Sequence, residues 1–317
     1  MAIDPPNRIR IGTCGYSYPA PPPRGWTGLF YPSQRGRRVD PLEYYSRFFD
    51  TVEINSSFYG PPSASMAHAW AGKTDPDFSF TLKLWQKFTH PRKVGQGGAT
   101  GEWEAAGQAD VDLFRAGIQP LADAGKLGAL VLQYPAGFVC NPENLDKLAG
   151  VLRSFADYPR AVELRHKSWS DQADETKSFL EQNGAGWVVI DEPKFASSIR
   201  QSFEPVSGMF YFRAHGRNAQ AWWTHKESWE RYDYCYSRDE IKRMAGKIRE
   251  AASKSGLRAF ALFNNHAGAQ APANALMFKH ELGLPPPGRP NEALLRKFPE
   301  LAEIFPAPPE KSLLNGS

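Results

Sequence analysis

Eight short apolar runs, separated by polar and helix-like segments, constrain the fold of this chain more than any other feature. Each run has the length and apolar content expected of a β-strand. The runs cover residues 8–11, 51–54, 78–84, 129–132, 160–164, 187–190, 209–212 and 259–263. Eight strands that alternate with helices and end in polar residues are typical of a (β/α)8 barrel of the TIM type. The active site of such a barrel lies at the C-terminal ends of its strands, so the pattern also predicts where the chemistry takes place.

Helical patterns fill most of the gaps between these runs. We expect helices over 42–49, 64–73, 108–124, 171–182, 241–255 and 271–282, and another that begins after Asn141 and Pro142. The gap between the sixth and seventh runs is short and predicts only a brief helical turn near 195–200. Long segments at 16–39, 85–107 and 216–236 each follow a strand, so we expect all three on the catalytic face.

An open doubly wound sheet is the alternative fold for alternating strands and helices. Such a sheet usually carries a glycine-rich phosphate loop after its first strand. Here Gly12 and Gly15 lead into a proline-containing segment rather than a helix, which favours the closed barrel. We therefore predict one α/β barrel domain over 8–283, followed by a proline-rich tail over 284–317 that wraps the outside or frays.

The composition fits one large folded domain and narrows the range of partners. Of the 317 residues, 41% are hydrophobic and 23% are charged, which is ordinary for a globular protein. The net charge of +4 suits an anionic ligand but does not favour nucleic acid as the partner. The three cysteines form no CxxC pair, and we see neither a signal peptide nor an apolar run that could cross a membrane. We expect a cytoplasmic protein without membrane contact, and nothing in the sequence sets its oligomeric state.

Polar residues gather where the predicted strands end. Side chains two positions apart share a face of a strand. Three runs end in such pairs, which are Glu53 with Asn55, Glu163 with Arg165, and Arg213 with His215. The remaining runs add single polar residues, among them Lys83, Gln133, Asp191 and Asn264. We expect these side chains to meet in the mouth of the barrel.

This set of residues predicts acid–base chemistry, of isomerase or hydrolase type, on a small anionic and hydroxylated substrate such as a sugar phosphate. Two carboxylates in different environments can serve as acid and base, and a histidine titrates near neutral pH. The catalytic candidates are Glu53, Glu163, His215 and Asp191. Guanidinium and ammonium groups suit an anion, and amides suit hydroxyls. The candidates for substrate binding are Asn55, Lys83, Gln133, Arg165, His166, Arg213, Asn264 and Asn265.

Other interpretations of the same residues remain open. The charges could form a purely structural network, although burying six charges without a ligand is unfavourable. A metal-dependent phosphodiesterase or nuclease would use the carboxylates and His215 to hold divalent ions, but no HExxH motif is present and the sequence requires no cofactor. A non-enzymatic barrel that binds a ligand is the third hypothesis. Cys14 is either a nucleophile near His215 or a small buried residue.

The segment 217–236 is rich in tryptophan and tyrosine. It is either a lid that stacks on a sugar or a base, or a loop that packs on its own side chains.

Six blocks of sequence, in a fixed order, carry a further signal. They are GTCGYSY at 12–18, WTGLFYP at 26–32, TVEINSSFY at 51–59, ELRHKSW at 163–169, RAHG at 213–216, and FNN at 263–265 with NAL at 274–276. This order resembles the DUF72 (YecE-like) family over about residues 9–282. The resemblance implies a TIM-type barrel but no reaction, because the family is named for its unknown function. It implies a site at Glu53, Asn55, Glu163, Arg165, His166, Arg213, His215, Asn264 and Asn265.

Two residues depart from the family pattern. Cys14 and Tyr16 stand where the family usually has serine and tryptophan. The departure argues against a family-wide chemical role for Cys14.

Overall fold

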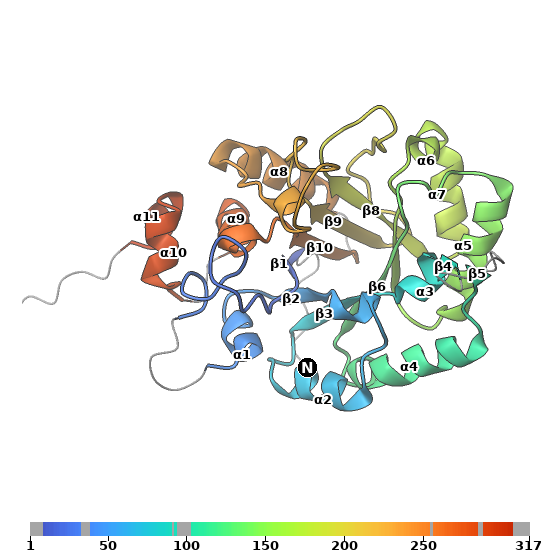
Figure 1. Ribbon diagram of the computed structural model, residues 1–317, viewed down its shortest axis with the longest axis horizontal. Coiled ribbons are helices and arrows are strands. Elements are labelled where there is room, and N and C mark those ends of the chain that lie inside the picture. Colours follow the sequence, from blue (N-terminus) through green and yellow to red (C-terminus); the bar gives the residue numbers. More distant parts are fainter. Residues whose placement is uncertain are drawn as a thin grey trace, which may run out of the picture.

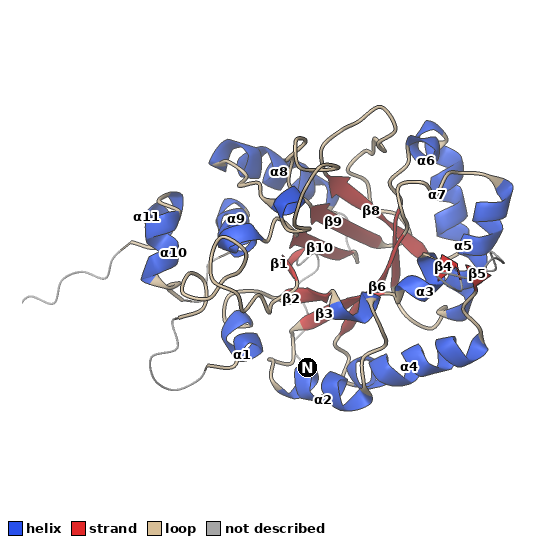
Figure 2. Ribbon diagram, in the orientation of Figure 1, coloured by secondary structure: helices blue, strands red, loops and turns tan. Residues whose placement is uncertain are grey.

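The fold is a closed barrel of eight parallel strands surrounded by helices (Figure 1). The structure is a computed structural model that describes residues 9–32, 39–90, 92–93, 103–253, 256–284 and 288–306. Around the barrel the strands follow the order β1, β10, β9, β8, β7, β6, β3 and β2. Figure 2 shows the strands at the centre with helices around them. The prediction of a TIM-type barrel is therefore confirmed.

Each of the eight apolar runs forms one barrel strand. The strands are β1 (Ile9–Cys14), β2 (Thr51–Ile54), β3 (Ser79–Lys83), β6 (Leu127–Gln133), β7 (Arg160–Glu163), β8 (Ala185–Asp191), β9 (Met209–Ala214) and β10 (Arg258–Phe263). A further antiparallel pair, β4 (Arg92–Lys93) and β5 (Trp103–Glu104), lies outside the barrel. Neighbouring barrel strands are parallel, so their C-terminal ends meet at one mouth.

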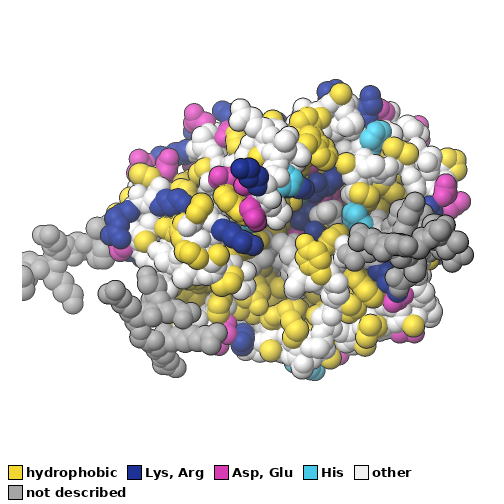
Figure 3. Space-filling view, in the orientation of Figure 1, with side chains coloured by type: hydrophobic (Ala, Val, Ile, Leu, Met, Phe, Trp, Pro, Cys, Tyr) yellow, Lys and Arg dark blue, Asp and Glu magenta, His cyan; other side chains and the backbone are white. Residues whose placement is uncertain are grey.

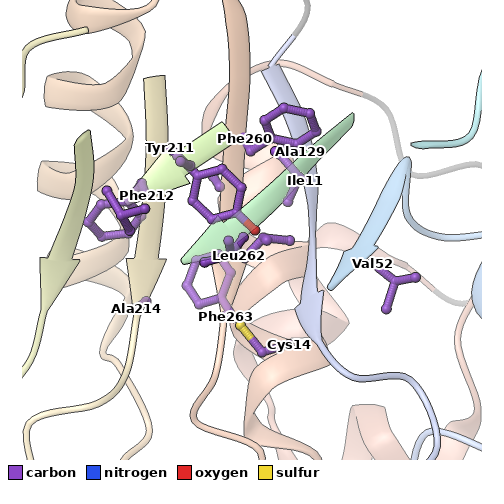
Figure 4. Close-up of a cluster of buried hydrophobic side chains, with 14 of the residues drawn as sticks. Ile11, Cys14, Val52, Ala129, Tyr211, Phe212, Ala214, Phe260, Leu262 and Phe263 are labelled. Carbon is purple, nitrogen blue, oxygen red and sulfur yellow. The ribbon is translucent and has the colours of Figure 1, made fainter. Parts of the chain in front are cut away.

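Both faces of the barrel strands are buried, which explains their nearly continuous apolar sequences. Figure 4 shows Tyr211 and Phe212, which are neighbours on β9, pointing in different directions. Phe212 contacts Phe203 on the outside of β9, and the Tyr211 hydroxyl bonds Thr81 of β3 at 2.8 Å across the interior. Alternation of this kind sends every second side chain of a strand toward the barrel axis.

The helices cover the outside of the barrel. They are α1 (Pro41–Tyr45), α2 (Ala64–Gly72), α3 (Gln86–Thr89), α4 (Gln108–Asp123), α5 (Pro142–Ser154), α6 (Lys167–Asp171), α7 (Ala173–Gln182), α8 (Arg238–Ala251), α9 (Gln270–Glu281), α10 (Glu292–Lys297) and α11 (Glu300–Ile304). Short 3-10 helices lie at η1 (Ser56–Phe58), η2 (Glu230–Tyr232) and η3 (Ala267–Ala269). Capping residues fix where some of these helices begin. Asp40 caps α1, and Ser237 with Glu240 forms the predicted capping box of α8.

The structure corrects three details of the helix prediction. The helix expected over 42–49 ends at Tyr45, because the next residues form a tighter turn. The helix expected over 171–182 begins at Ala173, because Gln172 is non-helical and separates it from the short helix α6 that ends at Asp171. The brief helical turn expected near 195–200 is a single hydrogen-bonded turn, from Ser198 N–H to the Phe195 carbonyl at 3.1 Å, and not a helix. The segment also pairs with the residues after β7, where Ile199 N–H bonds the Arg165 carbonyl at 2.8 Å and Ser198 bridges His166.

The described part of the tail adds two helices to the outside of the barrel. In Figure 1, α10 and α11 lie beside α9, and Leu294 and Leu301 are fully buried. The tail therefore packs on the barrel over this stretch, as the wrapping alternative predicts. Within the described ranges, no helix has the length and apolar character that a bilayer crossing needs.

The packing of α4 on the segment before α2 gives a first testable prediction. A Cβ added at Gly117 of α4 would lie 2.1 Å from the Pro62 carbonyl oxygen, whereas one added at Gly246 of α8 would meet no atom within 4 Å. We expect Gly117→Ala to lower the free energy of unfolding by about 1–3 kcal/mol through overpacking. The control Gly246→Ala should raise it by up to about 1 kcal/mol, because alanine is the better helix former. Urea unfolding of both variants measures the difference, and equal effects would contradict the packing described here.

Candidate functional site

A buried ionic layer lies at the C-terminal ends of the strands, and Arg213 is its centre. Arg213 Nη2 is 2.6 Å from Oε1 of Glu53, and Nη1 binds Oε2 of Glu163. Nη1 also donates to Oε1 of Gln133 at 3.0 Å. The arginine side chain is 1% exposed and both carboxylates are 0% exposed. One cation therefore holds two carboxylates from opposite sides of the barrel away from water.

Strand alternation explains how these groups meet. Glu53 lies on β2, Gln133 on β6, Glu163 on β7 and Arg213 on β9, each at or near the end of its strand. Tyr211 lies two residues before Arg213 and shares its face of β9. Its hydroxyl donates to Oε2 of Glu53 at 2.9 Å, so both oxygens of that carboxylate are occupied.

The surrounding cations keep Glu163 ionised. Burial alone would raise the pKa of this carboxyl. Arg213 and Arg165 together lower it by more, and the hydrogen bond to neutral His215 acts in the same direction, so the pKa of Glu163 lies well below its usual range. A carboxylate in this state is a strong anchor for guanidinium groups and a weak base.

Arg165 forms the outer edge of the ionic layer. Its Nη2 and Nε lie 2.6 and 2.8 Å from Oε1 of Glu163, so one side of the guanidinium is fixed. Nη1 is 3.7 Å from Oε2 of Glu192 and makes no hydrogen bond within the described part of the chain. The Arg165 side chain is 14% exposed, in contrast to the buried groups behind it. Arg165 is therefore a fixed and partly exposed cation whose Nη1 makes no hydrogen bond with a described residue.

His215 is neutral and buried behind Arg165. Burial and the nearby arginines lower its pKa to about 3, although Glu163 opposes the shift. The Asn264 amide nitrogen lies 2.9 Å from Nδ1, and Nε2 lies 3.5 Å from Oε2 of Glu163 and 3.4 Å from Nη2 of Arg165. The ring is held between an amide, a carboxylate and a guanidinium, so its orientation is fixed.

Lys83 is the part-buried cation of the mouth that lacks an oxygen partner. Its Nζ lies 4.2 Å from the centre of the Phe58 ring, and it makes no ion pair or hydrogen bond with any described residue. Burial and then Arg213 lower the pKa of Lys83 to about 8, against the opposing effect of Glu53 and Glu163. Figure 3 shows lysine or arginine side chains in a hollow near the middle of the visible face, with histidine side chains beside it.

Other candidate residues lie outside this cluster of direct contacts. Asp191 binds Arg217 and the Tyr236 hydroxyl, which ties the loop after β9 to β8. His166 caps α6 through a bond to Ser168 N–H. Asn265 donates to the Tyr234 carbonyl and to Asn274. The structure thus divides the candidates into two groups. Seven form one network: Glu53, Glu163, Arg165, Arg213, His215, Gln133 and Asn264. Three others, Asp191, His166 and Asn265, make hydrogen bonds that hold loops.

Asn55 lies just beyond β2 and precedes η1. Its side-chain oxygen is buried and has no hydrogen-bond partner among the residues described. An amide oxygen without a partner is available to a ligand hydroxyl, as predicted for this residue.

The sequence interpretation missed three residues of the network. Tyr211 and Thr81 lie two positions before Arg213 and Lys83 on their strands, so the same alternation rule could have found them. Glu192 directly follows Asp191 and was missed because only the last strand residue was considered. Burial raises the pKa of the Glu192 carboxyl, although Arg165 and Lys194 oppose the shift.

Cys14 is fully buried with its Sγ 3.7 Å from Arg213 Nη2. Burial and the charge of Glu53 raise the pKa of this thiol, so it stays protonated. These properties fit a small buried residue better than a nucleophile. Across the described ranges, no group of three or more His, Cys, Asp or Glu side chains is arranged to hold a metal ion.

The aromatic segment 217–236 covers His215. The rings of Trp222 and Tyr232 lie 6.5 and 6.3 Å from the imidazole, and 6.2 Å from each other. Trp222 is 4% exposed, whereas Trp223 is 62% exposed. The segment therefore lies on the catalytic face, as predicted, and packs on its own rings there.

Comparison with known proteins identifies the family. The family model for DUF72, described as a protein of unknown function, matches residues 10–296. The chain belongs to the DUF72 family. The UPF0759 protein YunF of Bacillus subtilis is 29% identical over 245 residues, which is 74% of this chain and 83% of YunF. The UPF0759 protein YecE of Escherichia coli K12 is 29% identical over 160 residues, covering 48% of this chain and 53% of YecE.

Solved DUF72 structures share the fold. A DUF72 family protein of Thermotoga maritima is 31% identical with a TM-score of 0.69, and the match covers 87% of this chain and 99% of that one. A DUF72 family protein of Enterococcus faecalis is 25% identical with a TM-score of 0.72, covering 87% and 96%. The resemblance drawn from the sequence blocks is therefore confirmed. The catalytic roles predicted for Glu53, Glu163, His215 and Asp191 in this DUF72 protein stay predictions.

The buried ionic layer predicts that replacing a buried arginine lowers the free energy of unfolding much more than replacing an exposed one. Arg213→Met would leave two carboxylates buried without their shared cation, and we expect a loss of about 3–5 kcal/mol in the free energy of unfolding. The control is Arg115→Met, because the Asp157 partner of Arg115 is 68% exposed. We expect that variant to lose about 1 kcal/mol or less. Urea unfolding distinguishes the two, and a small effect at Arg213 would contradict its central role.

The lowered pKa of His215 predicts acid sensitivity. Its pKa is about 3 in the folded protein against an ordinary 6.5, so between these values the unfolded chain binds a proton that the folded protein does not. The stability contributed by neutral His215 is fully present above about pH 6.5 and is lost as the pH falls toward 3. Glu163, whose folded pKa is also lowered, adds to the loss at acid pH.

We therefore expect His215→Gln to flatten the pH dependence of unfolding between about pH 6.5 and pH 4, by up to about 1.4 kcal/mol per pH unit. Urea titrations at several pH values provide the measurement. The exposed His68 offers a matched control, and His68→Gln should follow the parent slope. A parent slope that His215→Gln does not change would show that the histidine is protonated in the folded state.

Proposed function

We propose that this DUF72 protein is an enzyme that performs acid–base chemistry, of isomerase or hydrolase type, on a small anionic and hydroxylated substrate such as a sugar phosphate. One observation carries the proposal. Two cations in the mouth have incomplete partners: Arg165 Nη1 makes only a 3.7 Å ion pair with Glu192, and Lys83 Nζ meets no oxygen acceptor among the described residues. Part-buried cations with free donors are costly unless a ligand completes them, and an anion is the ligand that does so.

Arg165 is suited to hold the anion because its position is fixed in advance. Glu163 binds one side of its guanidinium, and Glu163 is itself bound by the buried Arg213. Little side-chain freedom is then lost when an anion binds Nη1, which favours binding and orientation. In this proposal Glu53, Glu163 and Arg213 position Arg165, since none of them has appreciable exposure.

Proton transfer is assigned to Glu192 in this proposal. Its Oε2 lies 3.7 Å from Nη1 of Arg165, so it borders the space where the anion would bind. Burial raises the pKa of its carboxyl, although Arg165 and Lys194 oppose the shift, so Glu192 holds a proton more readily than an ordinary glutamate. The Asn55 oxygen, which has no partner among described groups, is suited to a substrate hydroxyl.

Anion binding can be measured before a substrate is known. Titration calorimetry with inorganic phosphate should show binding to the parent protein. We expect Arg165→Met to weaken that binding by about tenfold or more, because a charge-assisted hydrogen bond is lost. Arg165→Lys should recover part of the affinity by restoring the charge. The control is Lys242→Met, which removes an exposed lysine on α8. Equal phosphate affinity in all variants would contradict the anion site.

Chemistry can be detected as exchange of carbon-bound hydrogen. Aldose and ketose phosphates would be incubated with the protein in deuterated water and followed by proton NMR. We expect exchange or isomerisation with at least one compound, and a loss of about 10²–10⁴-fold in rate for Glu192→Gln. Glu250→Gln, on the exposed face of α8, is the matched control. Phosphate binding without any conversion of the panel would favour the non-enzymatic barrel instead.

A further inference from the structure

Lys83 differs in its contacts from the other buried or half-buried lysines. The other buried or half-buried lysines of the described ranges each meet an oxygen acceptor. Lys87 pairs with Asp110, Lys177 with Glu204, Lys279 with Asp50, and Lys126 with the carbonyls of Ala71 and Thr74. Lys83 instead lies over the face of Phe58, with Nζ 4.2 Å from the ring centre. With no oxygen acceptor among the described residues, the Lys83 amine is available to a ligand.

The charges around Lys83 favour its neutral form. Burial and the positive charges of Arg213 and Arg165 lower its pKa to about 8, while Glu53 and Glu163 act in the opposite direction. Only the neutral amine has the lone pair that a nucleophile needs. Burial beside other cations is a known way to supply it near neutral pH.

A second titratable group contacts the ring over which the Lys83 amine lies. His90 contacts the same Phe58 ring, with the two ring centres 5.3 Å apart. Its Nδ1 is bonded to the Thr89 hydroxyl at 2.9 Å, and Nε2 has no partner among described residues. Burial, Lys83 and Arg165 lower the pKa of His90 to about 4, so the imidazole is neutral and can accept a proton.

We propose that Lys83 forms an imine with the carbonyl carbon of an anionic substrate whose charged group is bound by Arg165. The inference rests on the proposed function for the anion site and adds the substrate class, a carbonyl compound. The amine lone pair forms a C–N bond, the nitrogen loses one proton and the carbonyl oxygen takes one, which gives a neutral carbinolamine. The hydroxyl then takes a second proton and leaves as water when the C–O bond breaks, and the nitrogen keeps its remaining hydrogen in the protonated imine. His90 carries these protons, and no oxidant or reductant is needed.

An imine would explain how the site activates a carbon atom. The protonated imine withdraws electrons from the neighbouring C–H bond, so a nearby carboxylate can remove that proton. Glu192 borders Arg165 and is the group to which the proposed function assigns this step. Lys83 and Glu192 would then act on the same substrate from β3 and from the residue after β8.

Reductive trapping tests the proposal directly. The protein would be incubated with dihydroxyacetone phosphate and sodium borohydride, which converts an imine into a stable secondary amine. Mass spectrometry of the intact protein and of its peptides should place the adduct on Lys83. We expect Lys83→Arg to abolish that adduct and the control Lys242→Arg to retain it at the parent level. His90→Gln should slow adduct formation about tenfold or more without moving it.

Two further measurements separate the imine from the anion site. Uncharged dihydroxyacetone should give much less adduct, and inorganic phosphate should compete with dihydroxyacetone phosphate. Phosphate binding with no Lys83 adduct would overturn the imine and leave the anion site standing. An adduct on Lys83 that forms equally with the uncharged compound would support the imine and contradict the anion site. Trapping spread evenly over the surface lysines would overturn the inference, because Lys83 would then have no special reactivity.

Discussion

The contact between Arg213 and its two carboxylates is the interaction on which the rest of the site depends. A guanidinium that is 1% exposed is stable only if its donors are satisfied, and Glu53 and Glu163 satisfy them from β2 and β7. Because these strands lie apart around the barrel, the correct closure of the barrel is what brings the three charges together. Glu163 in turn fixes Arg165, and Glu53 receives the Tyr211 hydroxyl.

This arrangement separates the mouth into two layers with different physical roles. The inner layer, Arg213 with Glu53 and Glu163, has no appreciable exposure and its carboxylates are bound to cations, so it fixes the orientation of neighbouring groups. The outer layer contains Arg165, Lys83 and Glu192, whose polar groups are not fully used by the protein. A structural network alone would not need unused donors at its edge. The division therefore favours a ligand in the outer layer over the purely structural interpretation.

The sequence predicts the barrel well because strands that are buried on both faces must be apolar, and such apolar runs are visible in the sequence. Polar pairs such as Arg213 with His215 were equally visible, since alternation alone places both on one face. Strand alternation could not show which of Asp191 and Glu192 borders Arg165. The answer depends on where β8 ends and on the Tyr236 hydroxyl, which donates to Asp191. The turn at 195–200, which does not continue as a helix, has a similar cause: its backbone pairs with a distant segment, the residues after β7.

Which cation lacks a partner is likewise a property of the fold and not of the sequence. Lys83 ends β3, whereas Lys126 directly precedes β6 and donates to the carbonyls of Ala71, in the last turn of α2, and Thr74, just after it. Lys83 lies at the opposite end of its strand, where the nearest acids, Glu53 and Glu163, are already held by Arg213. Arg213 stabilises the inner layer by binding Glu53 and Glu163, and these carboxylates are then not available to pair with Lys83. The ion pairs of Arg213 therefore both stabilise the inner layer and leave the Lys83 amine available to a ligand.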